Sequence, residues 1–205
     1  MSQDCQKKPW TFESFLAQHG DDDRYELIDG QLFDLEPTGP HEEVAAFVAR
    51  KINVQIDILD LPFFIPQRCL IKPQSDLTGF RPDLVVLDRT ELVNELRWHR
   101  EPVITSGRSI QFVVEVVRSN WQNDYARKIE DYAALGIAEY WIVDYAALVG
   151  IRFIGKPKQP TLTICKLVDD RYEEVQLRGS EQITSPIFPG LNLTAEQVLQ
   201  SATVI

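Results

Sequence analysis

The sequence predicts an α/β or α+β layer fold in which helices flank a mixed β-sheet. Two observations carry this prediction. Residues 84–87 and 110–117 are almost continuously apolar, as expected for strands that are covered on both faces. Between and around them, apolar residues recur at the 3–4 spacing of amphipathic helices. The order of elements alternates helices with strands along most of the chain.

The first predicted elements are a short helix and a hairpin. Thr11 can cap a helix over residues 11–18, and Gly20 can end it. Residues 24–33 then read as two short strands around Asp29-Gly30. Asp-Gly between alternating apolar residues is a strong hairpin signal.

A longer helix is predicted after Pro40. Val44, Val48 and Ile52 recur on one face of that helix, and His41 begins the same inward face. A strand is expected near residues 68–71.

The clearest strands lie in the centre of the chain. The strand at 84–87 follows Arg81-Pro82-Asp83, and Glu115 interrupts the apolar strand at 110–117. Asp124 can cap a helix that runs to about Leu135 before Gly136. Residues 140–143 predict another buried strand.

Further strands are expected near residues 150–154, 161–166 and 174–177. Thr194 to Gln197 has a capping-box pattern that opens a last short helix. We expect one domain over residues 1–205, with its core at about 20–200 and a short N-terminal helix within 1–19.

The composition is that of a globular protein, with 44% hydrophobic and 25% charged residues. The net charge of −10 excludes a uniformly basic coat for nucleic acid, although residues 68–128 hold 10 basic and 8 acidic residues. No apolar run reaches the ~20 residues that span a bilayer, so no membrane contact is expected. The three cysteines include no CxxC, and no signal peptide is recognisable, which favours a cytoplasmic protein.

The candidate chemistry centres on Asp83 and Glu115. A carboxylate inside an apolar strand is costly to bury unless it is paired, protonated or bound to a metal. Two hard carboxylates on neighbouring strands suit Mg²⁺ or Mn²⁺. The alternative is that Glu115 simply pairs with an arginine or a lysine.

Lys128 is the third candidate. Asp124, Lys128 and Tyr132 lie four positions apart on one helical face, in a helix that must pack close to the strand of Glu115. The Lys128 ammonium could therefore hold an attacking water or stabilise developing phosphate charge. The alternative is a surface lysine paired with Asp124.

These residues together resemble the PD-(D/E)XK nuclease superfamily and, within it, the Uma family of restriction-endonuclease-like proteins. The resemblance covers roughly residues 20–200. It is carried by RYELIDGQL at 24–32, His41 at a helix start, Arg81-Pro82-Asp83, Glu115-Val116-Val117, Asp124, Lys128 and Tyr132, and GIAEYWIVD at 136–144. The short motifs are weak individually and specific in combination.

The resemblance implies a restriction-endonuclease-like core with a mixed central sheet. It also implies that Mg²⁺ or Mn²⁺ is held by Asp83, Glu115 and the backbone carbonyl of Val116. An early acidic residue often completes such sites, and Glu26 and Glu43 are the candidates. His41 could orient water or phosphate, or it could simply be hydrogen-bonded in the structure.

Two departures from the superfamily pattern stand beside Glu115. The lysine that usually follows two positions later is replaced by Val117, so Lys128 would have to supply that charge from the helix. Arg118 occupies a position where the family often has a small hydroxyl residue.

The predicted function is a metal-dependent endonuclease that hydrolyses phosphodiester bonds of nucleic acid, with DNA favoured over RNA, and that acts as a homodimer. One alternative is a catalytically inactive nuclease-fold module for binding or assembly. Another is a metal hydrolase of small phosphate esters, because a metal site alone does not choose the substrate.

Overall fold

The computed structural model describes residues 8–202 and contains a six-stranded mixed sheet with the order β10-β9-β8-β7-β5-β3. All neighbours in this sheet are antiparallel except β7 and β8, which are parallel. Its strands are β3 (Phe63–Phe64), β5 (Leu84–Asp88), β7 (Ile110–Val116), β8 (Glu139–Asp144), β9 (Thr161–Val168) and β10 (Arg171–Leu177).

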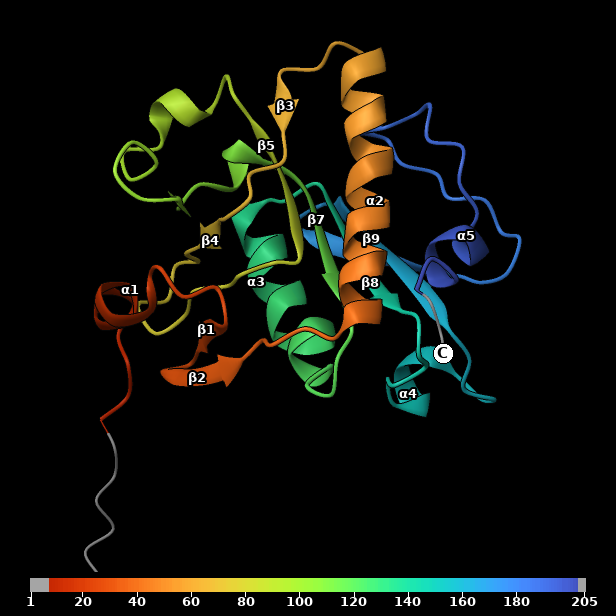
Figure 1. Cartoon of the computed structure of the whole chain (residues 1–205), viewed down its shortest axis with the longest axis horizontal. Helices are drawn as coiled ribbons and strands as arrows, with labels where there is room; N and C mark the ends of the chain where they lie inside the picture. The colour runs from red at the N-terminus through yellow and green to blue at the C-terminus, as the bar shows by residue number, and fades with distance from the viewer. Residues whose placement is uncertain (1–7, 203–205) are drawn as a thin grey trace, which may run out of the picture.

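Helices cover both faces of the sheet (Figure 1). The helical segments are α1 (Phe12–His19), α2 (Gly39–Ile58), η1 (Leu92–Asn94), η2 (Gly107–Ser109), the π-helical η3 (Asn123–Arg127), α3 (Lys128–Leu135), α4 (Ile151–Ile154) and α5 (Ala195–Leu199). Figure 1 shows the long helix α2 crossing the sheet, with α5 over the same face.

The core consists of two main apolar clusters, one for each face of the sheet. On one face, Val48 and Ile52 of α2 pack with Val114 of β7. On the other face, Tyr132 of α3 packs with Val113 of β7 and other strand residues. The alternation of side chains along β7 therefore assigns Val114 to α2 and directs Glu115 towards α3.

The N-terminal part forms a separate layer at one end of the sheet. The hairpin pairs β1 (Tyr25–Ile28) with β2 (Gln31–Asp34), and Phe12 and Phe15 of α1 pack with Leu27 in a third cluster. A second small sheet pairs β4 (Leu70–Ile71) in parallel with β6 (Val103–Ile104). This layer brings the hairpin against the start of β5, through the bridge between Leu27 and Gly79.

Most of the predicted elements are confirmed, including the mixed sheet flanked by helices. The predicted strand near 150–154 is wrong, because residues 151–154 form the helical turn α4 and bury Ile154. A short apolar run does not by itself distinguish a strand from a buried helical turn. The strand near 68–71 covers only two residues, and the helix predicted from Asp124 begins with a π-helical turn. No described helix is long and apolar enough to cross a membrane.

Candidate active site

The candidate site lies where strand β5 begins and strand β7 ends, beside the start of α3. The antiparallel pairing of Leu84 with Val114 places Asp83, just before β5, beside Glu115 on β7. Both carboxylates line one small hollow, which Lys128 of α3 and Asp124 of η3 also line. Residues from three separate parts of the chain therefore converge at one end of the sheet.

Lys128 joins three buried carboxylates. Its Nζ lies 3.0 Å from Glu115 Oε1, 3.2 Å from Glu26 Oε2 and 3.3 Å from Asp124 Oδ1. The Tyr132 hydroxyl donates a second hydrogen bond, of 2.9 Å, to Glu115 Oε1. Lys128 is 2% exposed, so the alternative of a surface lysine paired with Asp124 is wrong, although the pairing itself exists.

The ionisable groups of this cluster alter one another's pKa values. Burial raises the pKa of Glu115 well above its ordinary value, although Lys128 opposes the shift. Burial likewise raises the pKa of Asp124 to about 6. Burial would lower the pKa of Lys128, but Glu115, Glu26 and Asp124 outweigh burial and raise it well above its ordinary value. The lysine is therefore held as an ammonium.

Asp83 has a different set of partners. Its Oδ2 accepts a 2.7 Å hydrogen bond from the Val116 amide, and Arg118 Nη2 donates to its Oδ1 at 2.9 Å. His41 Nε2 lies 3.2 Å from the same Oδ2. Burial favours the neutral form of Asp83, but His41, Arg118 and the Val116 amide together lower the pKa of Asp83. Asp83 is thus held as a carboxylate.

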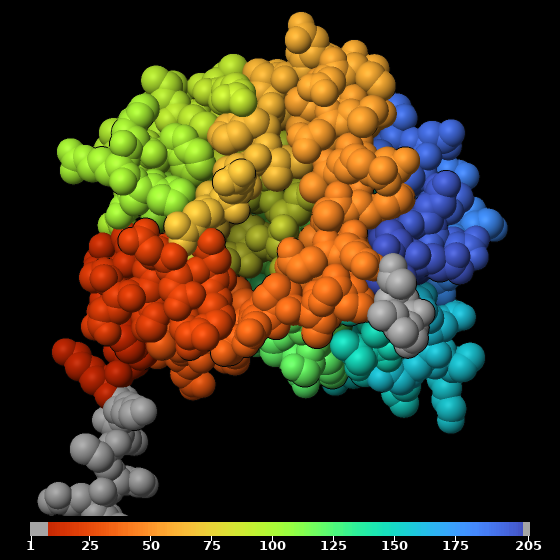
Figure 2. Space-filling model, in the orientation of Figure 1, coloured from red at the N-terminus to blue at the C-terminus, as the bar shows by residue number. Residues whose placement is uncertain are grey.

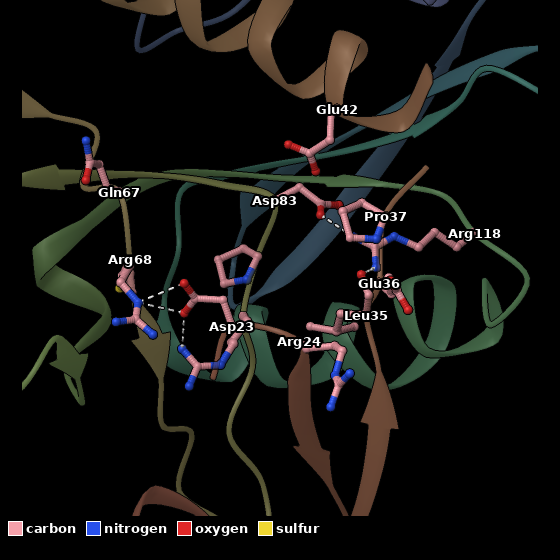
Figure 3. Close-up of a pocket in the computed structure, with 13 residues that line it drawn as sticks. Asp23, Arg24, Leu35, Glu36, Pro37, Glu42, Gln67, Arg68, Asp83 and Arg118 are labelled. Atoms are coloured by element: carbon pink, nitrogen blue, oxygen red, sulfur yellow. Dashed lines mark hydrogen bonds and ion pairs between the residues drawn. The ribbon is translucent and has the colours of Figure 1, made fainter. Parts of the chain in front are cut away.

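A cavity of about 410 Å³ opens beside Asp83. Figure 2 shows the recess on this face, between the N-terminal part in red and helix α2 in orange. Its charged lining residues are Asp23, Arg24, Glu36, Glu42, Arg68, Arg81, Asp83 and Arg118. Figure 3 shows the carboxylate of Glu42 reaching from α2 towards Asp83.

The structure brings together Asp83, Glu115, Lys128, Glu26 and His41 as a contiguous group. Glu43, by contrast, lies on the exposed side of α2 and is not among the residues that line the cavity. Sequence reasoning did not select its neighbour Glu42, which lines the cavity.

The contacts of Arg118 and Arg81, which the sequence analysis names, could not be predicted from residue types. Arg118 Nη1 donates to the backbone carbonyl of Leu35, in the segment that leads from the hairpin to α2. Arg81 donates backbone and side-chain hydrogen bonds to the hairpin and to the end of α1, including one to Glu26 Oε2. These contacts depend on chain segments that are distant in sequence, and therefore only the fold reveals them.

The oxygen donors at this site fit a hard divalent cation in chemical type. Four carboxyl groups meet here, from Glu26, Asp83, Glu115 and Asp124, and among the described residues Lys128 and Arg118 are their cationic partners. Because burial raises the pKa of Glu115 and of Asp124, a divalent cation bound here would favour the ionised form of both. Among the described residues, no group of three or more His, Cys, Asp or Glu side chains is placed so that it could hold a metal ion.

Comparison with known proteins supports a nuclease-like fold. Residues 12–196 match the Uma2 family, which is described as "Putative restriction endonuclease". A crystal structure of a "putative nuclease belonging to DUF820" from Anabaena variabilis superposes with a TM-score of 0.68 and 15% sequence identity. That superposition covers 94% of this chain and 99% of the other. No curated protein matches the sequence.

Proposed function

Because this chain belongs to the Uma2 family of restriction-endonuclease-like proteins, we propose that it is a divalent-metal-dependent nuclease that hydrolyses phosphodiester bonds of nucleic acid. The observation that carries the proposal is the group of four carboxyl groups at one end of the sheet, for which residues 8–202 supply two cationic partners. A group of this kind is costly to bury without a further positive charge.

The metal ligands in this proposal are Asp83, Glu115 and the backbone carbonyl of Val116. When bound there, Mg²⁺ or Mn²⁺ would polarise the scissile phosphate and lower the pKa of a coordinated water. Glu115 Oε1 is already engaged by Lys128 and Tyr132, so these two residues orient the carboxylate. Oriented ligands of this type favour metal binding, because less freedom is lost when the ion binds.

Lys128 has two roles in the proposal. Its ammonium neutralises part of the carboxylate charge, and it remains protonated at neutral pH because Glu115, Glu26 and Asp124 raise its pKa. It is placed to stabilise negative charge that develops on a phosphate beside Asp83 and Glu115. It would thereby replace the lysine that the superfamily usually places where this chain has Val117.

The cavity beside Asp83 supports nucleic acid as the substrate class. Arg24, Arg68, Arg81 and Arg118 line it, and arginine binds phosphate through paired hydrogen bonds. Because the whole chain carries a net charge of −10, we expect DNA binding that weakens steeply with salt. A homodimer that joins two such cavities would contact more phosphates, and analytical ultracentrifugation measures whether it forms.

The decisive test is nicking of supercoiled plasmid DNA in Mg²⁺ and in Mn²⁺. We expect metal-dependent nicking by the wild type and none by Asp83→Ala purified in the same way. The Asp57→Ala variant is the matched control, because Asp57 is exposed near the other end of α2. Nicking that persists in Asp83→Ala, or its absence from both proteins, would contradict the proposal.

One observation favours a second candidate function, that of an inactive binding module. Arg118 is paired with Asp83, the carboxylate that would otherwise face a metal. For an inactive binding module, we expect the same Mn²⁺ titration curve for the wild type and for Glu115→Gln. The nuclease proposal expects a weaker affinity for Glu115→Gln, so the comparison separates the two.

A further inference from the structure

The Nε2 atom of His41 lies within hydrogen-bond distance of three polar atoms, more than one ring nitrogen can satisfy. His41 is buried near the start of α2, and its Nε2 lies 3.1 Å from the Val116 carbonyl oxygen and 3.2 Å from Asp83 Oδ2. Arg118 Nε lies 2.9 Å from the same Nε2. Two hydrogen-bond acceptors and one donor therefore compete for a single nitrogen.

No protonation state of His41 satisfies all three contacts. If Nε2 carries a proton, it can donate to Asp83 or Val116, but it then opposes the N–H of Arg118. If Nε2 carries a lone pair, it accepts from Arg118 but faces two oxygen lone pairs at 3.1 and 3.2 Å. A polar group that stays buried without suitable partners is costly. A ligand bound at this point would remove the conflict.

A cation would be a suitable partner at this point. The lone pairs of His41 Nε2, Asp83 Oδ2 and the Val116 carbonyl oxygen could then all point at it. Neighbouring ligands of an octahedral ion with bonds of about 2.1 Å lie about 3.0 Å apart. The spacings from Nε2 to the two oxygens are close to that value. We propose that His41 Nε2, Asp83 Oδ2 and the Val116 carbonyl oxygen are ligands of one divalent cation, so that the metal site of this nuclease includes a nitrogen ligand.

The other ring nitrogen is consistent with this assignment. A lone pair on Nε2 requires the proton to be on Nδ1, and Nδ1 is buried without a hydrogen-bond partner among the described residues. The carboxylate oxygen Glu42 Oε1 lies 3.6 Å from Nδ1. A small rotation of the exposed Glu42 side chain would let it accept that proton. A carboxylate in this position fixes the tautomer of a metal-bound histidine.

The ligand set selects among metals. Mg²⁺ prefers oxygen ligands in near-ideal octahedral geometry, whereas Mn²⁺, a first-row transition metal, accepts an imidazole nitrogen among its oxygen ligands more readily. A site built from His41, Asp83 and a carbonyl therefore favours Mn²⁺ over Mg²⁺. This preference deepens the proposed nuclease function and rests on it.

Arg118 places a positive charge next to His41 and Asp83. Its guanidinium group contacts both His41 Nε2 and Asp83 Oδ1, and its side chain is 20% exposed at the edge of the open cavity. The side chain can therefore turn into the cavity when a metal ion arrives. Because Arg118 and the cation compete for Asp83, removal of the arginine charge would strengthen metal binding.

The test uses Mn²⁺ itself as the probe and does not depend on activity. Pulsed electron paramagnetic resonance of Mn²⁺ bound to the full-length protein detects nitrogen in its coordination shell. We expect imidazole coupling in the wild type and in His99→Gln, the matched control at an exposed histidine, and no coupling in His41→Gln. Mn²⁺ that binds to the wild type without nitrogen coupling would overturn the inference.

Affinity measurements give a second, independent outcome. We expect His41→Gln to bind Mn²⁺ at least about tenfold more weakly than the wild type, and to lose less affinity for Mg²⁺. Arg118→Gln should bind Mn²⁺ more tightly. Circular dichroism of both variants establishes that they are folded, and equal Mn²⁺ affinities for the wild type and His41→Gln would overturn the inference.

The two proposals fail in different ways. Metal-dependent nicking with Mn²⁺ bound only through oxygen would leave the nuclease proposal intact and contradict the role of His41. Mn²⁺ bound through His41 without nicking would leave the nitrogen ligand intact and contradict the nuclease function. A wild type that binds no Mn²⁺ would contradict both.

Discussion

Lys128 Nζ lies 3.0 Å from Glu115 Oε1, so the lysine beside the strand carboxylate comes from helix α3 and not from strand β7. The position just after β7 where the superfamily usually has this lysine holds Val117, which is buried in the core. The structure thus provides the ammonium from a second element at the same end of the sheet.

Removal of the Lys128 charge should destabilise the fold. Lys128→Met retains much of the side-chain volume but leaves Glu26, Glu115 and Asp124 without their cation. Breaking a buried ion pair from one side typically costs about 3–5 kcal/mol. Urea unfolding at pH 7 measures the loss. Arg100→Met is the control at an exposed position, and a Lys128→Met protein as stable as that control would contradict the ion-pair account.

A glycine contact near α3 predicts a second large effect. A Cβ on Gly107 would lie 1.8 Å from the Leu135 carbonyl oxygen, so Gly107→Ala must displace the end of α3. We expect a loss of at least about 2 kcal/mol in unfolding free energy. Gly39→Ala is the matched control, because a Cβ there meets nothing within 4 Å. Equal thermal stability of the two variants would show that this contact is not tight.

Glu139 gives the protein a pH-dependent stability. Burial raises the pKa of Glu139 above its ordinary value of 4.5, more than the hydrogen bonds from Ser185 and Trp141 lower it. The folded state therefore binds this proton more tightly than the unfolded state. The resulting stabilisation is complete below pH 4.5 and is lost as the pH rises through the raised pKa.

Urea unfolding of the wild type and of Glu139→Gln across pH 4–8 isolates this contribution. The wild type should lose stability relative to the variant as the pH rises from 4.5 through the raised pKa of Glu139. The expected loss is about 1.4 kcal/mol for each unit of pKa shift. Glu173→Gln, at an exposed position on β10, should show no such pH-dependent difference. A constant difference between the wild type and Glu139→Gln would refute the prediction.

The buried thiols should be unreactive in the folded protein. Burial raises the pKa of Cys69 to about 12 and also raises the pKa of Cys165, and only thiolates react rapidly with alkylating reagents. In a Cys5→Ser variant, we expect negligible labelling by iodoacetamide at pH 8 until denaturant is added. Rapid labelling of Cys69 without denaturant would show that its site opens easily.

Arg68 should contribute to DNA affinity through its charge. It lines the cavity beside Asp83, and its side chain is 38% exposed. Arg68→Gln should weaken DNA binding and reduce the salt slope by about 1, since one phosphate contact is lost. Fluorescence anisotropy over a salt series measures both quantities. Arg100→Gln is the control, and a similar change in that variant would show that only net charge matters.

The sequence predicts most of the fold because its signals are local. Asp29-Gly30 identifies the hairpin, the capping patterns of Thr11 and Thr194 identify two helix starts, and the apolar run with Glu115 identifies β7. The strand near 150–154 is the exception. There the buried Ile154 gives the same apolar signal in a helical turn as it would in a strand.

The site is only partly predictable for a related reason. Asp83, Glu115 and Lys128 stand out, because charged residues next to apolar strands or on a helical face require an explanation. The contacts of Arg118 with His41 and the Leu35 carbonyl join segments that are far apart in sequence. The choice between Glu42 and Glu43 depends on the rotation of α2 about its own axis, which apolar spacing fixes too coarsely to separate adjacent residues.

The π-helical turn η3 makes the site sensitive to the length of the chain. A π-turn holds one residue more than an α-turn, and each residue of a helix advances the face by about 100°. Deleting Ala126 would let residues 123–135 continue as a regular α-helix, with little change in composition. The same deletion would rotate Asp124 and Lys128 out of their present alignment. The length of this segment, to within one residue, therefore decides whether the helix places the Lys128 ammonium beside Glu115.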